Sequence, residues 1–454
     1  MRKKIITLTI AFVILLSSFV PVYGEEPLPI KLYGDAAVVA DLTTGDILYV
    51  KNADEKRYPA SLTKMMTCIL ALENLDLGQT VTVDSEASGI EGSSLKLKTG
   101  EKITAKDLVY ATMIISGNDG AMALAKAVCG SSEDFVAKMN KKAEELGCTG
   151  THFANPHGLQ DEDHYTTARD MAKIACYCMK NETFRDIVST VNYEVPQTNM
   201  STKRTLTTSN WLLNDTVENH MVYVGSTKRY CKYEGCIGIK TGSTSKAGNC
   251  LVAAATKDGT SILTVSMNAP NTYERFADGI ALLDLGLANF KTTSPFKFGM
   301  ELGTIKVKRG SVKTVTAVLD DTVYATLKKE EDASIITSEV TLVEQVDAPI
   351  SEGAIVGSIS VYKSGELLGV YDAVAANTVE KGGPLSIFGI DDATAAKIGK
   401  ILLIILIIIL VLFAALVVWV ILEKRRIRKK KERKAARLRA KQERENLNKS
   451  YRED

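Results

Sequence analysis

Three short strings, far apart along the chain, carry residue types that could perform acyl transfer. They are Ser61-Leu62-Thr63-Lys64, Ser116-Gly117-Asn118 and Lys240-Thr241-Gly242. A serine hydroxyl becomes an effective nucleophile when a neighbouring group takes its proton, and a lysine three residues later on a helix faces the same way. Each string alone has a structural explanation, as a helix start, a tight turn or a strand end. Together, and in this order, they predict a serine nucleophile with a lysine base.

Lys64 can act as a base only when its amine is uncharged. Burial and a second cation both lower the pKa of a lysine, and Lys240 is the predicted cation. We expect Ser61 at the start of a helix, where unpaired backbone N–H groups favour a developing oxyanion. Ser116 is the predicted proton relay to the leaving amine. Asn118 is predicted to bind a substrate amide, and it could cap the following helix at the same time.

The third string ends a β-type run, which we expect at the edge of a sheet. An extended peptide can add to such an edge as a further strand. Lys240 and Thr241 are the predicted partners of a substrate carboxylate, and Gly242 permits its close approach. The backbone N–H groups of Ser243 and Ser61 together form the predicted oxyanion hole.

Histidines and cysteines predict no metal site. His157 and His164 flank an acidic run, but their spacing fits neither a helix nor a strand, so a polar loop is the better interpretation. The eight cysteines contain no Cys-x-x-Cys pair, which argues against a zinc or thioredoxin-like site. Cys231 and Cys236 flank a four-residue turn and could form a disulfide in an exported domain. The sequence is equally compatible with two unbonded thiols.

The elements that must position these residues form one α+β region. Helices are predicted from Ser61, and from Thr104 with Asp107 in a capping box. Strands are predicted at both ends of the region, and a short one at 95–97. Strands that enclose a block of helices are best satisfied by an antiparallel sheet with helices on its faces. The main predicted strands are 36–41, 46–52, 236–241, 249–256 and 261–267, and the later helices are 119–128, 132–146, 167–179 and 273–289.

The remainder of the chain changes character. Period-two alternation over 293–375 predicts a small all-β sandwich domain, followed by a linker at 376–400. The uncharged run 401–422 would form a helix about 33 Å long, enough to cross a bilayer. A buried core helix is the alternative, but such helices are seldom apolar on every face. Basic residues follow the run at once, which predicts that the tail, 423–454, is cytoplasmic.

The amino terminus and the charge distribution agree with export. Residues 1–24 combine a basic start, an apolar stretch and small residues, as in a secretory signal peptide; an uncleaved signal anchor is the alternative. Residues 5–422 hold 38 basic and 48 acidic residues, so nothing there predicts nucleic-acid binding. The basic tail could bind RNA, but anionic lipid headgroups are the simpler partner beside a span. A solvated tail without a specific partner is equally compatible.

Residues 36–290 resemble the low-molecular-mass penicillin-binding proteins, the D-alanyl-D-alanine carboxypeptidases. Beyond the three strings, the resemblance rests on four stretches, at 58–64, 155–159, 167–171 and 238–242. It implies a β-lactamase/transpeptidase-like α+β fold, and it implies that Arg275 helps to bind the substrate's terminal carboxylate. Gln160 and Ser243 depart from residues that are frequent in the family. A true membrane span replaces the amphipathic helix found in many relatives.

The resemblance implies a single-pass bacterial membrane enzyme with its catalytic domain outside the cytoplasm. Ser61 would attack the penultimate D-alanine of peptidoglycan stem pentapeptides, and water would hydrolyse the acyl-enzyme. A β-lactam would acylate the same serine, and no cofactor is required. A β-lactamase is the first alternative, disfavoured because no Glu-x-x-Leu-Asn-type string lies between the second and third strings. A membrane-bound β-lactam sensor lacks room for an effector after Leu422, and a non-catalytic cell-wall-binding protein would not need these residue types.

Overall fold

The computed structural model describes residues 30–214 and 220–450, so the predicted signal peptide, residues 1–24, lies outside the described residues. The described chain forms two compact units. The first contains the residues up to Pro295 together with Val323–Ile336, and the second contains Phe296–Thr322 and the chain from Thr337 onward.

A five-stranded antiparallel sheet is the framework of the first unit. Its strand order is β2-β1-β11-β10-β9, so β9 forms one edge and pairs only with β10 among the described strands. This placement confirms the edge position predicted for the strand that carries Lys240. The bounds are β1 Ala36–Asp41, β2 Ile47–Lys51, β9 Cys236–Thr244, β10 Gly248–Lys257 and β11 Thr260–Ala269.

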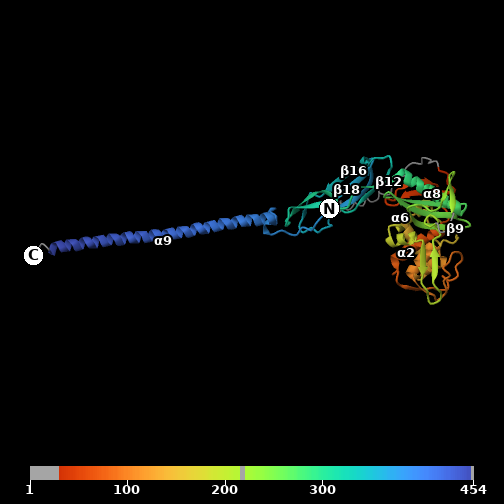
Figure 1. Cartoon of the computed structure of the whole chain (residues 1–454), viewed down its shortest axis with the longest axis horizontal. Helices are drawn as coiled ribbons and strands as arrows, with labels where there is room; N and C mark the ends of the chain where they lie inside the picture. Colours follow the sequence, from red (N-terminus) through yellow and green to blue (C-terminus); the bar gives the residue numbers. More distant parts are fainter. Residues whose placement is uncertain (1–29, 215–219, 451–454) are drawn as a thin grey trace, which may run out of the picture. The chain divides into compact units, whose positions relative to one another are not determined.

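Helices cover both faces of this sheet. Successive residues of a strand point to opposite faces, so Val38 lies in the core shared with the helical block, while Val39 lies in the core under α8 (Thr272–Asn289). Figure 1 shows α8 on one side of the sheet and α6 (Ala168–Cys178) on the other. The α+β architecture predicted from the sequence is therefore confirmed.

The helical block lies on the α6 side of the sheet. Four of its helices, α3, α5, α6 and α7, begin where a side chain accepts a hydrogen bond from the backbone N–H three residues on, at Thr104, Ser131, Thr167 and Asn181. The capping box predicted at Thr104 is confirmed, since its Oγ1 accepts from the N–H of Asp107. Besides α6, the block contains η1 Ala60–Thr63, α2 Lys64–Asn74, α3 Ala105–Ile114, α4 Asn118–Cys129, α5 Ser132–Glu145 and α7 Glu182–Ser189.

Three further two-stranded sheets belong to the first unit. They pair β3 (Thr80–Thr82) with β4 (Lys102–Thr104), β5 (Asn192–Val195) with β6 (Arg204–Thr207), and β7 (Met221–Val224) with β8 (Thr227–Tyr230). The prediction of a strand at 95–97 is wrong. The backbone N–H groups of Leu95 and Leu97 instead donate to the buried carboxylate of Asp119, at 3.0 and 3.1 Å. Their hydrogen-bond partner is therefore a side chain and not the backbone of a neighbouring strand.

The buried carboxylate of Asp41, at the end of β1, connects the five-stranded sheet to two strands that follow α8 in the sequence. Asp41 accepts hydrogen bonds from the hydroxyls of Thr292, at 2.6 Å, and Thr326, at 2.9 Å. Thr292 lies in β12 (Phe290–Phe296) and Thr326 in β15 (Val323–Lys328), two strands that pair with each other. The first unit therefore includes a strand from the region that the sequence assigns to the following domain, whose boundary at 293 remains a prediction.

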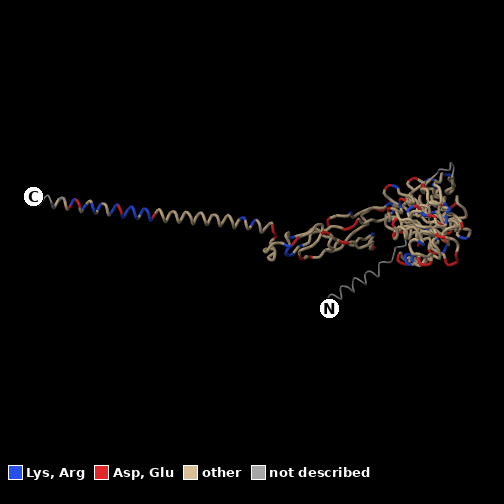
Figure 2. The backbone as a smooth tube through the Cα atoms, turned by 90° about the horizontal axis from the view of Figure 1, so that it is seen from below, with Lys and Arg blue, Asp and Glu red and all other residues tan. Residues whose placement is uncertain are grey.

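The second unit contains a six-stranded sheet and a long helix. The strand order is β16-β18-β19-β14-β13-β17, with β13 and β17 parallel, which confirms the predicted all-β region. After the turn η3 (Pro384–Phe388), α9 (Asp392–Ser450) includes the uncharged run, shown in tan before the densely basic part in Figure 2. The strands are β13 Glu301–Lys308, β14 Thr314–Leu319, β16 Ile336–Leu342, β17 Gln345–Asp347, β18 Ile355–Lys363 and β19 Glu366–Ala375. By length and composition, α9 can cross a membrane.

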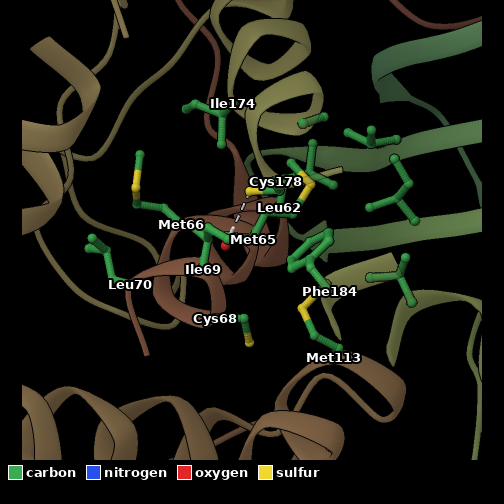
Figure 3. Close-up of a cluster of buried hydrophobic side chains, with 14 of the residues drawn as sticks. Leu62, Met65, Met66, Cys68, Ile69, Leu70, Met113, Ile174, Cys178 and Phe184 are labelled. Carbon is green, nitrogen blue, oxygen red and sulfur yellow. Dashed lines mark hydrogen bonds between the residues drawn. The ribbon is translucent and has the colours of Figure 1, made fainter. Parts of the chain in front are cut away.

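The core behind α2 holds the first unit together. Figure 3 shows Met65 and Ile69 of α2 packed near Cys178 of α6 and Phe184 of α7, and the Sγ of Cys178 lies 3.7 Å from the carbonyl oxygen of Met65. Phe184 is fully buried. Because three helices meet at this cluster, its packing fixes how α2 is placed against the rest of the block.

Phe184→Ala should lower the free energy of unfolding of the first unit by about 3–5 kcal/mol, because it removes buried apolar contacts and leaves a cavity. Urea unfolding followed by circular dichroism measures the change. Tyr223→Ala is the matched control, since Tyr223 is exposed and should change stability by less than about 0.5 kcal/mol. Equal effects of the two substitutions would contradict the assigned core.

Candidate active site

The first string brings the Ser61 hydroxyl and the Lys64 amine together. Their Oγ and Nζ atoms are 2.9 Å apart, and Lys64 Nζ also donates to the carbonyl oxygen of His157 at 2.5 Å. Ser61 lies in the 3-10 turn η1, and the α-helix begins only at Lys64. The helix predicted from Ser61 is therefore present: it begins as the 3-10 turn η1 at Ala60 and continues as α2 from Lys64, with the Ser61 and Lys64 side chains in contact.

Lys64 is fully buried. Burial holds the pKa of its amine well below the usual value, and the positive charge of Lys240 lowers this pKa further. An uncharged amine can donate one N–H to the His157 carbonyl and still accept the proton of the Ser61 hydroxyl through its lone pair. The lowered pKa makes this uncharged form more accessible than it is for a solvent-exposed lysine.

The second and third strings meet through another lysine–serine pair. Lys240 Nζ donates to the Oγ of Ser116 at 3.0 Å and to the carbonyl oxygen of Thr241 at 2.9 Å. Ser116 connects α3 to α4 with a φ of +62°, a left-handed conformation that is uncommon outside glycine. Burial lowers the pKa of Lys240 to about 7, and the positive charge of Arg275 is the second cause.

The end of β9 lies against the turn that holds Ser61. A Cβ atom at Gly242 would stand 3.1 Å from the Ser61 nitrogen, so glycine allows the strand to approach this backbone closely. Thr241 Oγ1 is 2.8 Å from the Oγ of Ser209, and Arg275 Nη1 donates to the carbonyl oxygen of Gly242 at 3.2 Å. Ser243 follows as an exposed residue of the same strand.

Arg275 and Asn118 are both buried at this site. The Nε of Arg275 has no hydrogen-bond partner in the described part of the chain, and burial lowers the pKa of the guanidinium to about 10. Asn118 Nδ2 donates to the carbonyl oxygen of Glu91 at 2.6 Å. The expectation that Asn118 caps α4 is wrong, because Gly117 holds the cap position and Asn118 is the first helical residue.

A loop that the sequence analysis left without a role contributes to the site. The hydroxyl of Thr67 donates to the Pro156 carbonyl oxygen at 2.5 Å, and the hydroxyl of Thr63 lies 2.7 Å from His164 Nε2. These contacts hold the His157 carbonyl oxygen against Lys64. Burial lowers the pKa of His157 to about 3 and that of His164 to about 4, so both rings are uncharged at neutral pH.

Two sequence features pointed to this loop: the polar run between His157 and His164, and the stretch 155–159 that carries the resemblance. Neither indicated a role for the carbonyl oxygen of His157. A backbone carbonyl has no sequence signature of its own. Asp119, whose carboxylate holds the segment 94–97 beside α4, was missed in the same way, although it directly follows the second string.

Cys231 and Cys236 form no disulfide in the structure, which describes both residues. The structure favours the unbonded alternative. The Sγ of Cys236 instead lies 3.5 Å from the carbonyl oxygen of Gly238, and burial raises its pKa to about 12, which keeps the thiol protonated.

Comparison with known proteins places this geometry in a family. Residues 24–271 match the family described as D-alanyl-D-alanine carboxypeptidase, and residues 290–381 match the penicillin-binding protein 5 C-terminal domain. This chain belongs to the D-alanyl-D-alanine carboxypeptidase family. The first match covers more than half of the chain and includes all three strings. The chain is a hydrolase with D-alanyl-D-alanine carboxypeptidase function, built on the penicillin-binding protein fold.

Individual relatives agree with this placement. The chain is 33% identical to D-alanyl-D-alanine carboxypeptidase DacF of Bacillus subtilis, over 84% of this chain and 96% of the relative. It is 31% identical to DacC of Escherichia coli, over 77% of this chain and 84% of the relative. The crystal structure of penicillin-binding protein 5 from Haemophilus influenzae superimposes with a TM-score of 0.61 at 28% identity, covering 78% of this chain and 99% of that one.

Gly158→Ala should disrupt the loop that carries the His157 carbonyl. Gly158 has a φ of +85°, and a Cβ atom there would lie 1.9 Å from the carbonyl oxygen of Ala60. We expect a loss of about 3–5 kcal/mol of stability from strain and overlap combined. The release of D-alanine from an acyl-D-Ala-D-Ala peptide should also slow, because Lys64 loses its carbonyl partner.

Gly259→Ala provides the control for backbone strain alone. Its φ is +80°, but no atom lies within 4 Å of the added Cβ. The substitution should cost about 1–2 kcal/mol and leave D-alanine release per folded molecule unchanged. If the two variants lost stability and activity equally, close packing of the His157 loop would not be the reason.

Proposed function

We propose that the chain removes the terminal D-alanine of peptidoglycan stem pentapeptides through an acyl-enzyme on Ser61. The observation that carries the proposal is the contact of 2.9 Å between Ser61 Oγ and the fully buried Nζ of Lys64. A serine hydroxyl beside an uncharged amine is the arrangement that nucleophilic catalysis requires. Membership of the D-alanyl-D-alanine carboxypeptidase family supports cleavage of the bond between the two terminal D-alanines.

The proposed first step transfers one proton and exchanges one bond. Lys64 takes the proton of Ser61 while Oγ bonds to the carbonyl carbon of the penultimate D-alanine. The negative charge that develops on the carbonyl oxygen is stabilised by the backbone N–H groups of Ser61 and Ser243. When the intermediate collapses, the C–N bond breaks and the terminal D-alanine departs with a proton that reaches its nitrogen through Ser116.

The second step returns the enzyme to its starting state. Water attacks the ester carbonyl, loses a proton to Lys64, and the C–O bond to Ser61 breaks as its hydroxyl regains a proton. A β-lactam offers a strained amide to the same serine, so it should acylate Ser61 as a substrate mimic. The proposed mechanism needs no metal or organic cofactor, because the lysine amine and the backbone N–H groups supply the base and the oxyanion donors.

Recognition of the substrate's terminal carboxylate is assigned to Lys240, Thr241 and Arg275. Lys240 and Arg275 are buried cations without a carboxylate partner among the described residues, and burial lowers the pKa of each. A carboxylate in contact with both would remove part of that electrostatic cost. Asn118, buried at the start of α4, is placed to hold a peptide amide of the substrate.

The proposed location is the outer face of a bacterial cytoplasmic membrane. The uncharged run of α9 is compatible with a single membrane anchor, and the basic residues that follow it favour a cytoplasmic tail. The catalytic unit then faces the cell wall, where stem peptides and β-lactams are found.

Ser61→Ala should abolish covalent labelling by a fluorescent penicillin and lower D-alanine release from diacetyl-L-Lys-D-Ala-D-Ala by more than about 10³-fold, because the nucleophile is removed. Ser245→Ala is the control, since Ser245 is exposed in the turn after β9 and should retain both activities. Unchanged release by the Ser61 variant would refute the acyl-enzyme mechanism.

When a substrate with a terminal carboxylate binds above about pH 7, the amine of Lys240 should take up a proton. Lys240 has a pKa of about 7 in the empty site, and a bound carboxylate raises it by favouring the charged amine. Affinity should therefore fall as the pH rises past 7, by up to about tenfold per pH unit, until the pKa of the complex is reached.

Calorimetry of Ser61→Ala with N-acetyl-D-Ala-D-Ala, in two buffers of different ionisation enthalpy, measures this uptake. The C-terminal amide of the same ligand is the control, because it lacks the carboxylate and should bind without taking up a proton. Equal proton uptake with both ligands would show that Lys240 does not meet the carboxylate.

A further inference from the structure

The turn η3 presents large apolar side chains to solvent. Ile387 is 71% exposed and Phe388 is 78% exposed. The turn is nevertheless well defined by backbone hydrogen bonds of 2.9 Å, from Ser386 N to the Gly383 oxygen and from Gly389 N to the Ser386 oxygen. Contiguous apolar side chains held outward in this way mark a contact surface.

A basic groove adjoins this turn. It encloses about 780 Å³ and is lined by Ile387 together with residues of β13 and the loop that follows, including Lys306, Lys308, Arg309 and Lys313. Arg309 pairs with Asp347 at 3.0 Å, and Lys313 with Asp391 at 3.5 Å. Lys306 and Lys308, exposed on one face of β13, have no acidic partner among the described residues, so the groove keeps a positive charge.

The turn and the groove are tied to the first residue of α9. Asp392 Oδ1 accepts from the N–H of Gly383 at 2.8 Å, and the N–H of Asp392 donates to the carbonyl oxygen of Ser311 at 3.1 Å. Ile401, where the uncharged run begins, is the ninth residue after Asp392, and at 1.5 Å per residue the two are about 14 Å apart along the helix. Membrane helices tilt by about 20° on average, and a tilt toward η3 brings the turn closer to the headgroups.

We propose that η3 and this groove form a juxtamembrane surface that contacts anionic phospholipids. Ile387 and Phe388 enter the interfacial layer, and Lys306 and Lys308 bind headgroup phosphates beside them. Apolar side chains next to lysines are the combination that membrane interfaces attract. The proposal rests on the proposed insertion of α9. It gives the β-sheet unit a second attachment to the bilayer, which restricts its rotation about the helix.

Phe388→Trp tests the apolar contact in the full-length chain. The variant is reconstituted in phosphatidylcholine/phosphatidylglycerol vesicles whose acyl chains carry bromine, a short-range quencher of tryptophan emission. We expect the emission added at residue 388 to be blue-shifted and quenched. Leu367→Trp is the matched control, because Leu367 is also exposed. It lies near the start of β19, eight residues or about 26 Å before Ala375, the end of the strand from which the chain continues to η3. The emission added at residue 367 should stay unquenched.

Trp419, within the uncharged run, reports separately whether α9 is inserted. Quenching of Trp419 without quenching at residue 388 would overturn the juxtamembrane surface and leave the anchor standing. If neither were quenched, the anchor would be wrong and this proposal would fail with it.

The headgroup contact is tested by Lys306→Glu with Lys308→Glu in the Phe388→Trp chain. The double substitution should reduce quenching at residue 388 in vesicles that contain phosphatidylglycerol, and it should have no effect in pure phosphatidylcholine, where no anionic lipid is present. Inorganic phosphate should not compete at the concentration of the lipid. Headgroup binding would be contradicted if quenching at residue 388 were the same with and without the double substitution, and the same in vesicles with and without phosphatidylglycerol.

Discussion

Two lysine amines are buried at one site, and each is held in the same way. Lys64 contacts the Ser61 hydroxyl and the His157 carbonyl oxygen, while Lys240 contacts the Ser116 hydroxyl and the Thr241 carbonyl oxygen. Burying an unpaired ammonium ion costs several kcal/mol, so burial lowers the pKa of both amines. The rest of the first unit can be understood as the framework that keeps these two amines dry and close to their serines.

That framework depends on close approaches between backbones. The strand β9 comes near Ser61 because residue 242 has no Cβ, and the His157 loop packs on the carbonyl oxygen of Ala60 because residue 158 has none. The apolar side of α2 is fixed by the cluster around Phe184. A shift of any of these elements would open space around Lys64, and water in that space would stabilise the charged amine that the proposed base must avoid.

Local sequence signals predicted most side chains of the candidate site, with Arg275 added by the resemblance, but not the backbone groups that complete it. The three strings, the Thr104 cap and the β-type runs of β9 to β11 are recognisable from residue types, and all were predictable. The His157 carbonyl and the carboxylate of Asp119 act through partners far away along the chain, which no local pattern encodes. The pairing of β15 with β12 is hidden for the same reason, since strand partners distant in sequence are chosen by the folded core.

The order of the two pKa causes at Lys64 bears on the proposed mechanism. Burial is the larger cause and the charge of Lys240 the smaller. A substrate carboxylate on Lys240 would offset that charge, so a site that relied on Lys240 alone would lose its base when substrate arrived. Because burial is the larger cause, and because a bound peptide would exclude further water, the pKa of Lys64 should stay lowered in the complex. In the proposed mechanism, Lys240 on β9 would bind the substrate carboxylate, and the packing behind α2 would exclude water from Lys64 and so favour its uncharged form.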